Sequence, residues 1–216
     1  KRGIDGREGH DHKQGWNGHV DFDRVDTIPT MTTPKIIAFA GSIRNESVNK
    51  RLSKIALKAA EEAGAEVTWV DLADYQMPLY CQDYETEQGL PDSVIAFKEL
   101  LKGNDGFLIA SPEYNGSLTG VMKNTIDWTS RRAEGEPRMA CWDGKIAGLL
   151  AASPGGLGGL RGLSHLRTIL AGIGTLVLPN HVAVGNAGTN LVDDVQIADE
   201  KLQLAVTNQA TELVRV

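Results

Sequence analysis

The chain has 216 residues, of which 41% are hydrophobic and 23% are charged, values typical of one globular domain or slightly more. Its 28 acidic side chains outnumber its 22 basic ones, and the net charge of −6 argues against a protein that grips a nucleic-acid backbone. No apolar run approaches the roughly 20 residues of a membrane-spanning helix, so membrane insertion is not expected.

Residues 1–33 have the composition of a polar leader. Their few apolar side chains follow neither a period of 2 nor one of 3.6. Such a stretch buries too little apolar surface to offset the conformational entropy lost on ordering. We expect it to be flexible or to be an addition upstream of a natural start at Met31, and we expect residues 34–216 to form the functional domain. His10 and His12 are interpreted as parts of a solvated tail rather than as metal ligands.

The two cysteines, Cys81 and Cys141, lie 60 positions apart and belong to no C-x-x-C or Cys/His ligand pattern. This spacing excludes a disulfide scaffold and a cysteine-based zinc site, so no metal site is expected. We expect both thiols to be buried. The N-terminus has no continuous apolar segment of the secretory type, and together with the free thiols this predicts a cytoplasmic protein.

From residue 34 onward, apolar runs and amphipathic patterns alternate. Residues 35–40 form a short apolar run that predicts a fully buried strand, and residues 48–63 repeat apolar side chains with the spacing of a helix that stops at Gly64. Residues 66–72 alternate like a strand, and a polar stretch then runs to Gly89. A second helix is predicted between Pro91 and Gly103, followed by a strand over 107–110.

The same alternation continues to the end of the chain. We expect helices at 121–128, 160–173 and about 194–214, and strands at 145–151 and 176–178. Five units of a strand followed by a helix predict an α/β fold, a doubly wound five-stranded parallel sheet with helices on both faces. Ligands of such sheets bind outside the carboxyl ends of the strands, so function is sought after the first, third and fourth strands.

The loop after the first strand, residues 41–49, carries hydroxyls, an arginine and an amide directly before a helix. Unpaired N–H groups at a helix start attract an anion, and these side chains add charge-assisted hydrogen bonds. The loop matches neither the G-x-x-x-x-G-K-[ST] nor the G-x-G-x-x-G pattern, which disfavours nucleoside triphosphates and a Rossmann-type dinucleotide grip. A monophosphate fits it best. The alternative is an ordinary serine-rich helix cap beside a surface arginine.

Two further loops have shaped backbones. Residues 111–120 contain a proline, a tyrosine and two glycines, and residues 153–159 contain four glycines, so both permit the close approach of a flat ligand. For the first of these loops, a plain turn remains the alternative. No G-x-S-x-G nucleophile is present, His165 is interpreted as structural, and Glu113 alone makes no acid/base pair. A bound cofactor is therefore expected to carry the chemistry.

These motifs together resemble the NAD(P)H-dependent FMN reductase family, which has a flavodoxin-like fold and includes azo-dye, quinone and chromate reductases. The resemblance extends from about residue 34 to the C-terminus. It rests on Gly41-Ser42-x-Arg44-x-x-Ser47-x-Asn49, Ser111-Pro112-Glu113-Tyr114-Asn115-Gly116-Ser117 and Lys123-Asn124-x-Ile126-Asp127-Trp128. The chain departs from the family pattern at Thr119, where a proline is usual, and after Ser130, where the usual proline is displaced. The first departure is expected to change its loop little, and the second leaves substrate choice open.

The resemblance implies FMN as the cofactor, with NADPH or NADH as the co-substrate, and a homodimer or homotetramer in which a neighbouring subunit completes the flavin site. It implies that the phosphate binds at Ser42, Arg44, Ser47 and Asn49. It also implies that the isoalloxazine ring rests on Pro112, Glu113, Tyr114 and Asn115, and that the loop containing Ser153, Gly155 and Gly156 closes over the other edge of the ring.

The implied reaction is ping-pong: the nicotinamide passes a hydride to the flavin, and a small acceptor such as a flavin, quinone, azo compound or metal oxyanion then takes two electrons. The choice between NADPH and NADH stays open. Arg131, Arg132 and Arg161 are candidates to meet a 2′-phosphate, with solvated arginines as the alternative. The alternative function is a flavodoxin-type electron carrier without its own NAD(P)H turnover. A third possibility, a binding module that has lost the flavin, is disfavoured because the loops are intact.

Overall fold

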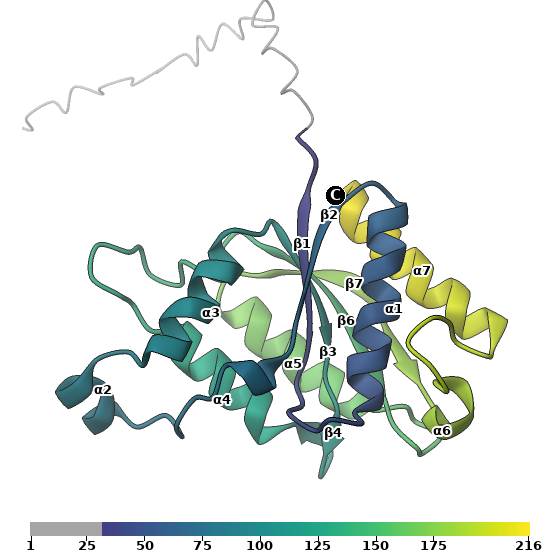
Figure 1. Ribbon diagram of the computed structural model, residues 1–216, viewed down its shortest axis with the longest axis horizontal. Helices are drawn as coiled ribbons and strands as arrows, with labels where there is room; N and C mark the ends of the chain where they lie inside the picture. Colours follow the sequence, from purple (N-terminus) through teal and green to yellow (C-terminus); the bar gives the residue numbers. More distant parts are fainter. Residues whose placement is uncertain (1–31) are drawn as a thin grey trace, which may run out of the picture. The chain divides into compact units, whose positions relative to one another are not determined.

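Five parallel strands form the central sheet, in the spatial order β2-β1-β3-β6-β7 (Figure 1). The structure is a computed structural model that describes residues 32–216, and Thr33–Val216 form one compact unit. The winding direction reverses between β1 and β3, which confirms the predicted doubly wound, flavodoxin-like topology. The strands are β1 (Lys35–Ala40), β2 (Glu66–Val70), β3 (Gly106–Ala110), β6 (Ile146–Ala152) and β7 (Leu176–Val184). Residues 1–31 of the predicted leader, including its histidines, lie outside the described part, so this prediction is not tested.

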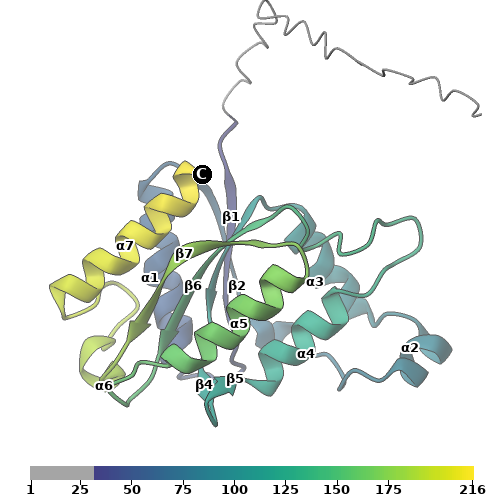
Figure 2. The same ribbon diagram turned by 180° about the vertical axis from the view of Figure 1, so that it is seen from behind.

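Helices cover both faces of the sheet, each through an apolar stripe. α1 (Val48–Glu62) and α7 (Glu200–Arg215) pack on one face, while α3 (Asp92–Lys102), α4 (Gly120–Thr129) and α5 (Leu160–Gly172) pack on the other. Figure 2 shows α4 and α5 lying across this second face. Among residues 32–216, no helix is both long and apolar enough to cross a membrane.

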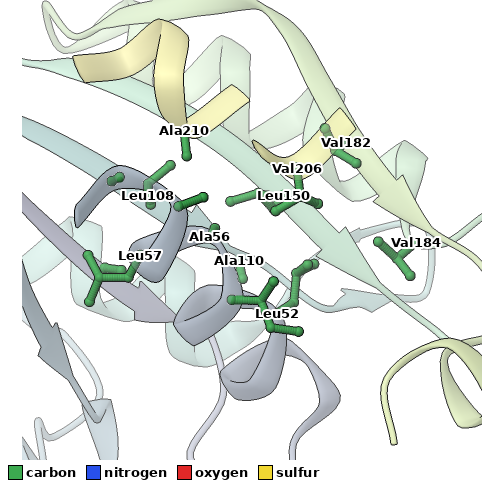
Figure 3. Close-up of a cluster of buried hydrophobic side chains, with 14 of the residues drawn as sticks. Leu52, Ala56, Leu57, Leu108, Ala110, Leu150, Val182, Val184, Val206 and Ala210 are labelled. Carbon is green, nitrogen blue, oxygen red and sulfur yellow. The ribbon is translucent and has the colours of Figure 1, made fainter. Parts of the chain in front are cut away.

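The first face carries a core of small and branched side chains, drawn in Figure 3. Leu52 and Ala56 of α1 meet Val206 and Ala210 of α7 over the strands. The small alanines let the two helices lie close to the sheet and to one another. This packing holds the start of α1, and with it the loop after β1, at a fixed place on the edge of the sheet.

The last strand is longer than its sequence predicts. The apolar run covers only 176–178, but β7 continues through Pro179 to Val184, and its register with β6 shifts between Ala147 and Leu149. β7 is an edge strand of the sheet, so the missing N–H of Pro179 is tolerated there. The final helix begins at Glu200 rather than near residue 194, because the Asp199 carboxylate caps it by accepting hydrogen bonds from the backbone N–H groups of Lys201 and Leu202.

Several short elements do not follow from periodicity. They are η1 (Leu72–Asp74), α2 (Gln82–Gln88), the hairpin of β4 (Glu113–Tyr114) and β5 (Ser117–Leu118), and α6 (Ala187–Asn190). α2 has no buried residue at all, so its sequence carries no apolar stripe to recognise. The prediction that both cysteines are buried is wrong for Cys81, which is exposed on this segment, while Cys141 is buried.

Candidate functional site

Three loops meet at the carboxyl edge of the sheet, the lower edge in Figure 1 near β4. They follow β1, β3 and β6, which are neighbours in the sheet, so residues 41–47, 111–119 and 153–159 come together although they are far apart in sequence. This is the edge, next to the reversal of winding, where doubly wound sheets bind ligands.

The loop after β1 leads into a helix whose start has no side-chain cap. Ser47 is the N-cap of α1, yet its buried side chain makes no capping hydrogen bond. Ser42 is also buried, and its Oγ accepts a hydrogen bond from the backbone N–H of Arg44 at 3.3 Å. The Arg44 side chain is exposed and forms no ion pair with any carboxylate in the described part of the chain. Helix N–H groups, two hydroxyls and a free guanidinium are what a phosphate monoester needs.

The place of Asn49 in the motif implies a phosphate contact, but its side chain hydrogen-bonds to the backbone at the end of β6. Its Nδ2 donates to the carbonyl oxygen of Ala152 at 2.9 Å, and its Oδ1 accepts from the backbone N–H of Ala152 at 2.8 Å. The side chain is only 2% exposed. Because both polar atoms are engaged, Asn49 joins the first turn of α1 to the end of β6 and stands behind the loop rather than at its open face.

The loop after β3 folds into a hairpin, β4–β5, around Asn115 and Gly116. Both of these residues have a positive φ, 51° and 78°, which is the two-residue turn whose twist suits antiparallel strands. Pro112, directly before β4, is buried, and Tyr114 beside the turn is 51% exposed. The loop is therefore a short hairpin rather than the plain turn considered as the alternative, and it presents an aromatic ring and backbone groups at this edge of the sheet.

The Glu113 carboxylate points to the start of α5. It accepts hydrogen bonds from the backbone N–H groups of Arg161 at 2.9 Å and Gly162 at 3.2 Å, and from Nε of Arg161 at 2.7 Å. Burial alone raises the pKa of Glu113, but these donors outweigh burial and hold the pKa below its usual value. The side chain of Glu113 is thus an ion-pair partner of α5, while its backbone forms the first residue of β4 in the hairpin.

The glycine-rich loop after β6 contains one exposed pair of glycines and one tightly packed pair. Gly155 and Gly156 are exposed, and a Cβ added to either meets nothing closer than 3.7 Å, so a ligand has open access there. Gly158 and Gly159 have positive φ and pack tightly: a Cβ at Gly158 lies 2.7 Å from the backbone at the end of β7. The first pair opens the site and the second pair holds the loop in place.

A further contact ties the loops together and was not foreseen from the sequence. Thr119 is buried, donates from Oγ1 to the carbonyl oxygen of Gly41 at 2.7 Å, and caps α4 by accepting from the N–H of Met122 at 3.0 Å. Thr119–Gly41, Asn49–Ala152 and Glu113–Arg161 are called the three clasps below. Each joins two different loops or strand ends, so the edge of the sheet is held as one rigid unit.

The remaining predicted polar residues have structural partners. Ser153 donates to the carbonyl oxygen of Gly155 at 3.4 Å. His165 lies 2.8 Å from the hydroxyl of Ser117, which links α5 to β5. Arg131 lies over the Tyr80 ring at 5.3 Å, and Arg132 donates from Nε to the carbonyl oxygen of Glu136 at 2.7 Å.

A cavity of about 460 Å³ opens beside this edge. It is bounded by the loop after β1, by the segment around η1 and by one side of α4. Its walls combine apolar and amide side chains, a suitable lining for a flat organic substrate. The principal lining residues are Ile43, Tyr75, Gln76, Met77, Val121 and Asn124.

Comparison with known proteins agrees with this geometry. Residues 34–189 match the model of the family described as NADPH-dependent FMN reductase. A probable NADPH:quinone oxidoreductase of rice is 38% identical over 143 residues, which are 64% of this chain and 66% of the rice protein. An NAD(P)H-dependent FMN reductase of Pseudomonas aeruginosa is 32% identical over 181 residues, covering 83% of this chain and 92% of that protein.

Among solved structures, FerB, a flavoenzyme NAD(P)H:(acceptor) oxidoreductase from Paracoccus denitrificans, aligns with a TM-score of 0.70 at 28% identity, over 85% of this chain and 96% of FerB. Fold and loops define an α/β oxidoreductase of the flavodoxin-like class. The chain belongs to the NADPH-dependent FMN reductase family. The predicted family, enzyme class, FMN cofactor and nicotinamide reductant are confirmed at this level, whereas the individual binding residues and the acceptor remain predictions.

Proposed function

We propose that residues 34–216 form an FMN-dependent reductase domain that uses NAD(P)H to reduce a small quinone by two electrons. The proposal rests on three features that meet at the carboxyl edge of the sheet. They are the start of α1, which has no side-chain cap and lies beside the exposed Arg44, the β4–β5 hairpin with its exposed tyrosine, and the open backbone at Gly155 and Gly156. The first feature fits a phosphate monoester, and the other two fit the faces and edge of a planar ring.

In this arrangement Ser42, Arg44 and Ser47 bind the phosphate, while Asn49 positions their loop through Ala152. Pro112, Tyr114 and Asn115 support the isoalloxazine ring, and the backbone at Ser153, Gly155 and Gly156 borders its other edge. FMN, when bound, accepts a hydride from the nicotinamide and delivers two electrons onward. The backbone N–H groups of the hairpin stabilise negative charge on the ring, so no acid/base side chain is required.

The reduced nicotinamide and the acceptor occupy the same exposed side of the hairpin in turn. A quinone-type acceptor is favoured because the neighbouring cavity of about 460 Å³ has a mixed apolar and amide lining, and because the rice relative carries that name. Flavins, azo compounds and metal oxyanions are competing acceptors in the assay. Of the candidate arginines for a 2′-phosphate, Arg161 is ion-paired to Glu113 but 65% exposed, so it is the best placed for that contact.

The proposal includes a homodimer or homotetramer. α2 has no buried residue, and the large apolar side chains of Leu79 and Tyr84 in this segment are 84% and 39% exposed, so a second copy of the chain would have side chains to cover here. It also includes a reducing, cytoplasmic setting, which both free thiols and the need for reduced nicotinamide support.

The proposal is tested with FMN-loaded protein and initial rates measured over a grid of NADPH and 1,4-benzoquinone concentrations. Parallel lines in the double-reciprocal plot are expected, because the two substrates use one site in succession. The same grid with an azo dye and with free FMN ranks the acceptors by kcat/KM. A protein that holds FMN but oxidises neither NADPH nor NADH is instead an electron carrier, and it will then accumulate a one-electron reduced flavin on titration with dithionite.

A further inference from the structure

The N-terminus of α5 is capped from a distant part of the chain. Gly159, its N-cap residue, is in the left-handed conformation and has no side chain, and the first turn of α5 contains no acidic residue. The missing acceptor is supplied by Glu113, which lies 48 positions before Arg161 and accepts hydrogen bonds from the backbone N–H groups of Arg161 and Gly162. A carboxylate at this place also interacts favourably with the positive end of the helix dipole.

The same carboxylate forms an ion pair with the side chain of Arg161. Nη2 of Arg161 lies 2.5 Å from Oε1 of Glu113, and Nε donates to the same oxygen. The Glu113 side chain is 7% exposed, whereas that of Arg161 is 65% exposed. The Glu113 carboxylate accepts from two backbone N–H groups and one guanidinium N–H, so the clasp is matched to a negatively charged acceptor at position 113.

The clasp fixes the hairpin against α5. Glu113 is the first residue of β4, and the hairpin rests directly on the first turn of the helix: a Cβ added to Gly162 would lie 3.1 Å from the carbonyl oxygen of Ser117. The fixed carboxylate is one residue from Tyr114 and two from Asn115. The Glu113–Arg161 ion pair and the positive end of α5 therefore lie next to the hairpin on which FMN is proposed to bind.

We propose that Glu113 is a positioning residue that holds the β4–β5 hairpin in its flavin-binding conformation and, through its fixed negative charge, lowers the reduction potential of the bound flavin. This inference rests on the proposed function. Reduction adds negative charge to the ring, so a neighbouring anion disfavours the reduced form and a neighbouring cation favours it. Glu113 and Arg161 consequently act on the potential with opposite signs, although they form one structural clasp.

The test compares Glu113→Gln with Arg161→Gln, and uses Glu212→Gln as the matched control, since Glu212 is also paired to an arginine but lies on α7 at the other face of the sheet. Dissociation constants of oxidised and of reduced FMN are measured for each protein. We expect Glu113→Gln to raise the ratio of the dissociation constant of oxidised FMN to that of reduced FMN by three- to tenfold, and Arg161→Gln to lower this ratio. A tenfold change in the ratio corresponds to about 30 mV for a two-electron couple. The control leaves the ratio unchanged.

Amide hydrogen exchange in the FMN-free proteins gives a second readout. Exchange across 113–118 is expected to accelerate in Glu113→Gln and to change less in Arg161→Gln, which keeps the two backbone N–H donors. Potentials that shift in the same direction in both variants, or not at all, overturn the inference. If Glu113→Gln does not fold, Arg161→Gln still tests the inference: a flavin reduction potential that is raised or unchanged in this variant overturns it. A wild-type protein that binds no FMN contradicts the proposed function itself, and the two failures are therefore distinguishable.

Discussion

The Asn49–Ala152 clasp allows a sharp test of how the site is held together. Asn49→Ala removes one donor and one acceptor from a place that is 2% exposed, and the N–H and carbonyl of Ala152, itself 2% exposed, lose their partners. Each buried polar group left without a partner costs about 1–3 kcal/mol. With partial relief from entering water, we expect a loss of about 3 kcal/mol in the free energy of unfolding, a large share of the ~5–15 kcal/mol typical of a domain.

Asn49→Asp tests the same clasp with almost no change in shape. The new carboxylate still accepts from the N–H of Ala152, but it places an acceptor against the carbonyl oxygen of Ala152 where a donor stood. We expect a loss at least equal to that of Asn49→Ala. A loss of about 3 kcal/mol lowers the urea midpoint by about 1–3 M, given m-values of about 1–3 kcal/mol/M.

The measurement is urea unfolding of FMN-free protein, followed by tryptophan fluorescence. Asn45→Ala is the matched control, because Asn45 lies on the same loop with its side chain exposed, and it is expected to change stability by less than about 0.5 kcal/mol. If Asn49→Asp unfolds at the wild-type midpoint, the clasp contributes nothing and the positioning role assigned to Asn49 is refuted.

Three other predictions concern separate parts of the molecule. Arg44→Ala is expected to weaken FMN binding about thirtyfold, or ~2 kcal/mol, in a flavin-fluorescence titration, because one charge-assisted contact is lost; an unchanged affinity contradicts the phosphate site, and Arg138→Ala, another exposed arginine, is the control. Burial raises the pKa of Glu136, but hydrogen bonds from Lys102 and Lys98 outweigh it and lower the pKa to about 2. Its stabilising effect is thus complete above about pH 4.5 and is lost as pH falls toward 2, so urea midpoints of wild type should fall over that range more steeply than those of Glu136→Gln. Finally, a thiol reagent at pH 8 should label the exposed Cys81 rapidly and Cys141 only after denaturation, since burial raises the pKa of Cys141 to about 11; two fast thiols would contradict the packing.

The elements that the sequence predicts well are those with a strong local signal. β1 is found at its predicted bounds, because its apolar run is continuous and Gly41 ends it. β7 is predicted only in part, since Pro179, Asn180 and His181 interrupt the pattern on an edge strand that tolerates them. The β4–β5 hairpin is too short to show a strand period, and only its Asn115-Gly116 pair indicates a turn in the sequence.

The hydrogen bonds that form the three clasps cannot be predicted from the sequence, because they join residues that are far apart along the chain. Asn49 and Ala152 are 103 positions apart, and Thr119 and Gly41 are 78 apart, so no local pattern connects them. The motif predicts that Asn49 and Glu113 belong to the site, but it does not say which way their side chains point. The roles of Asn49 and Glu113 depend on partners that only the folded chain brings close. By contrast, an anion-binding role for Ser42, Arg44 and Ser47 is predicted from their position directly before a helix.

The reductase function is tested by adding NADPH without oxygen to the purified, FMN-loaded protein while its visible spectrum is recorded. We expect the protein to retain FMN and the flavin absorption to bleach promptly in a single two-electron step, with NADH as the comparison reductant. A yellow protein whose spectrum neither NADPH nor NADH changes would contradict the reductase function. A protein that retains no FMN would contradict the site.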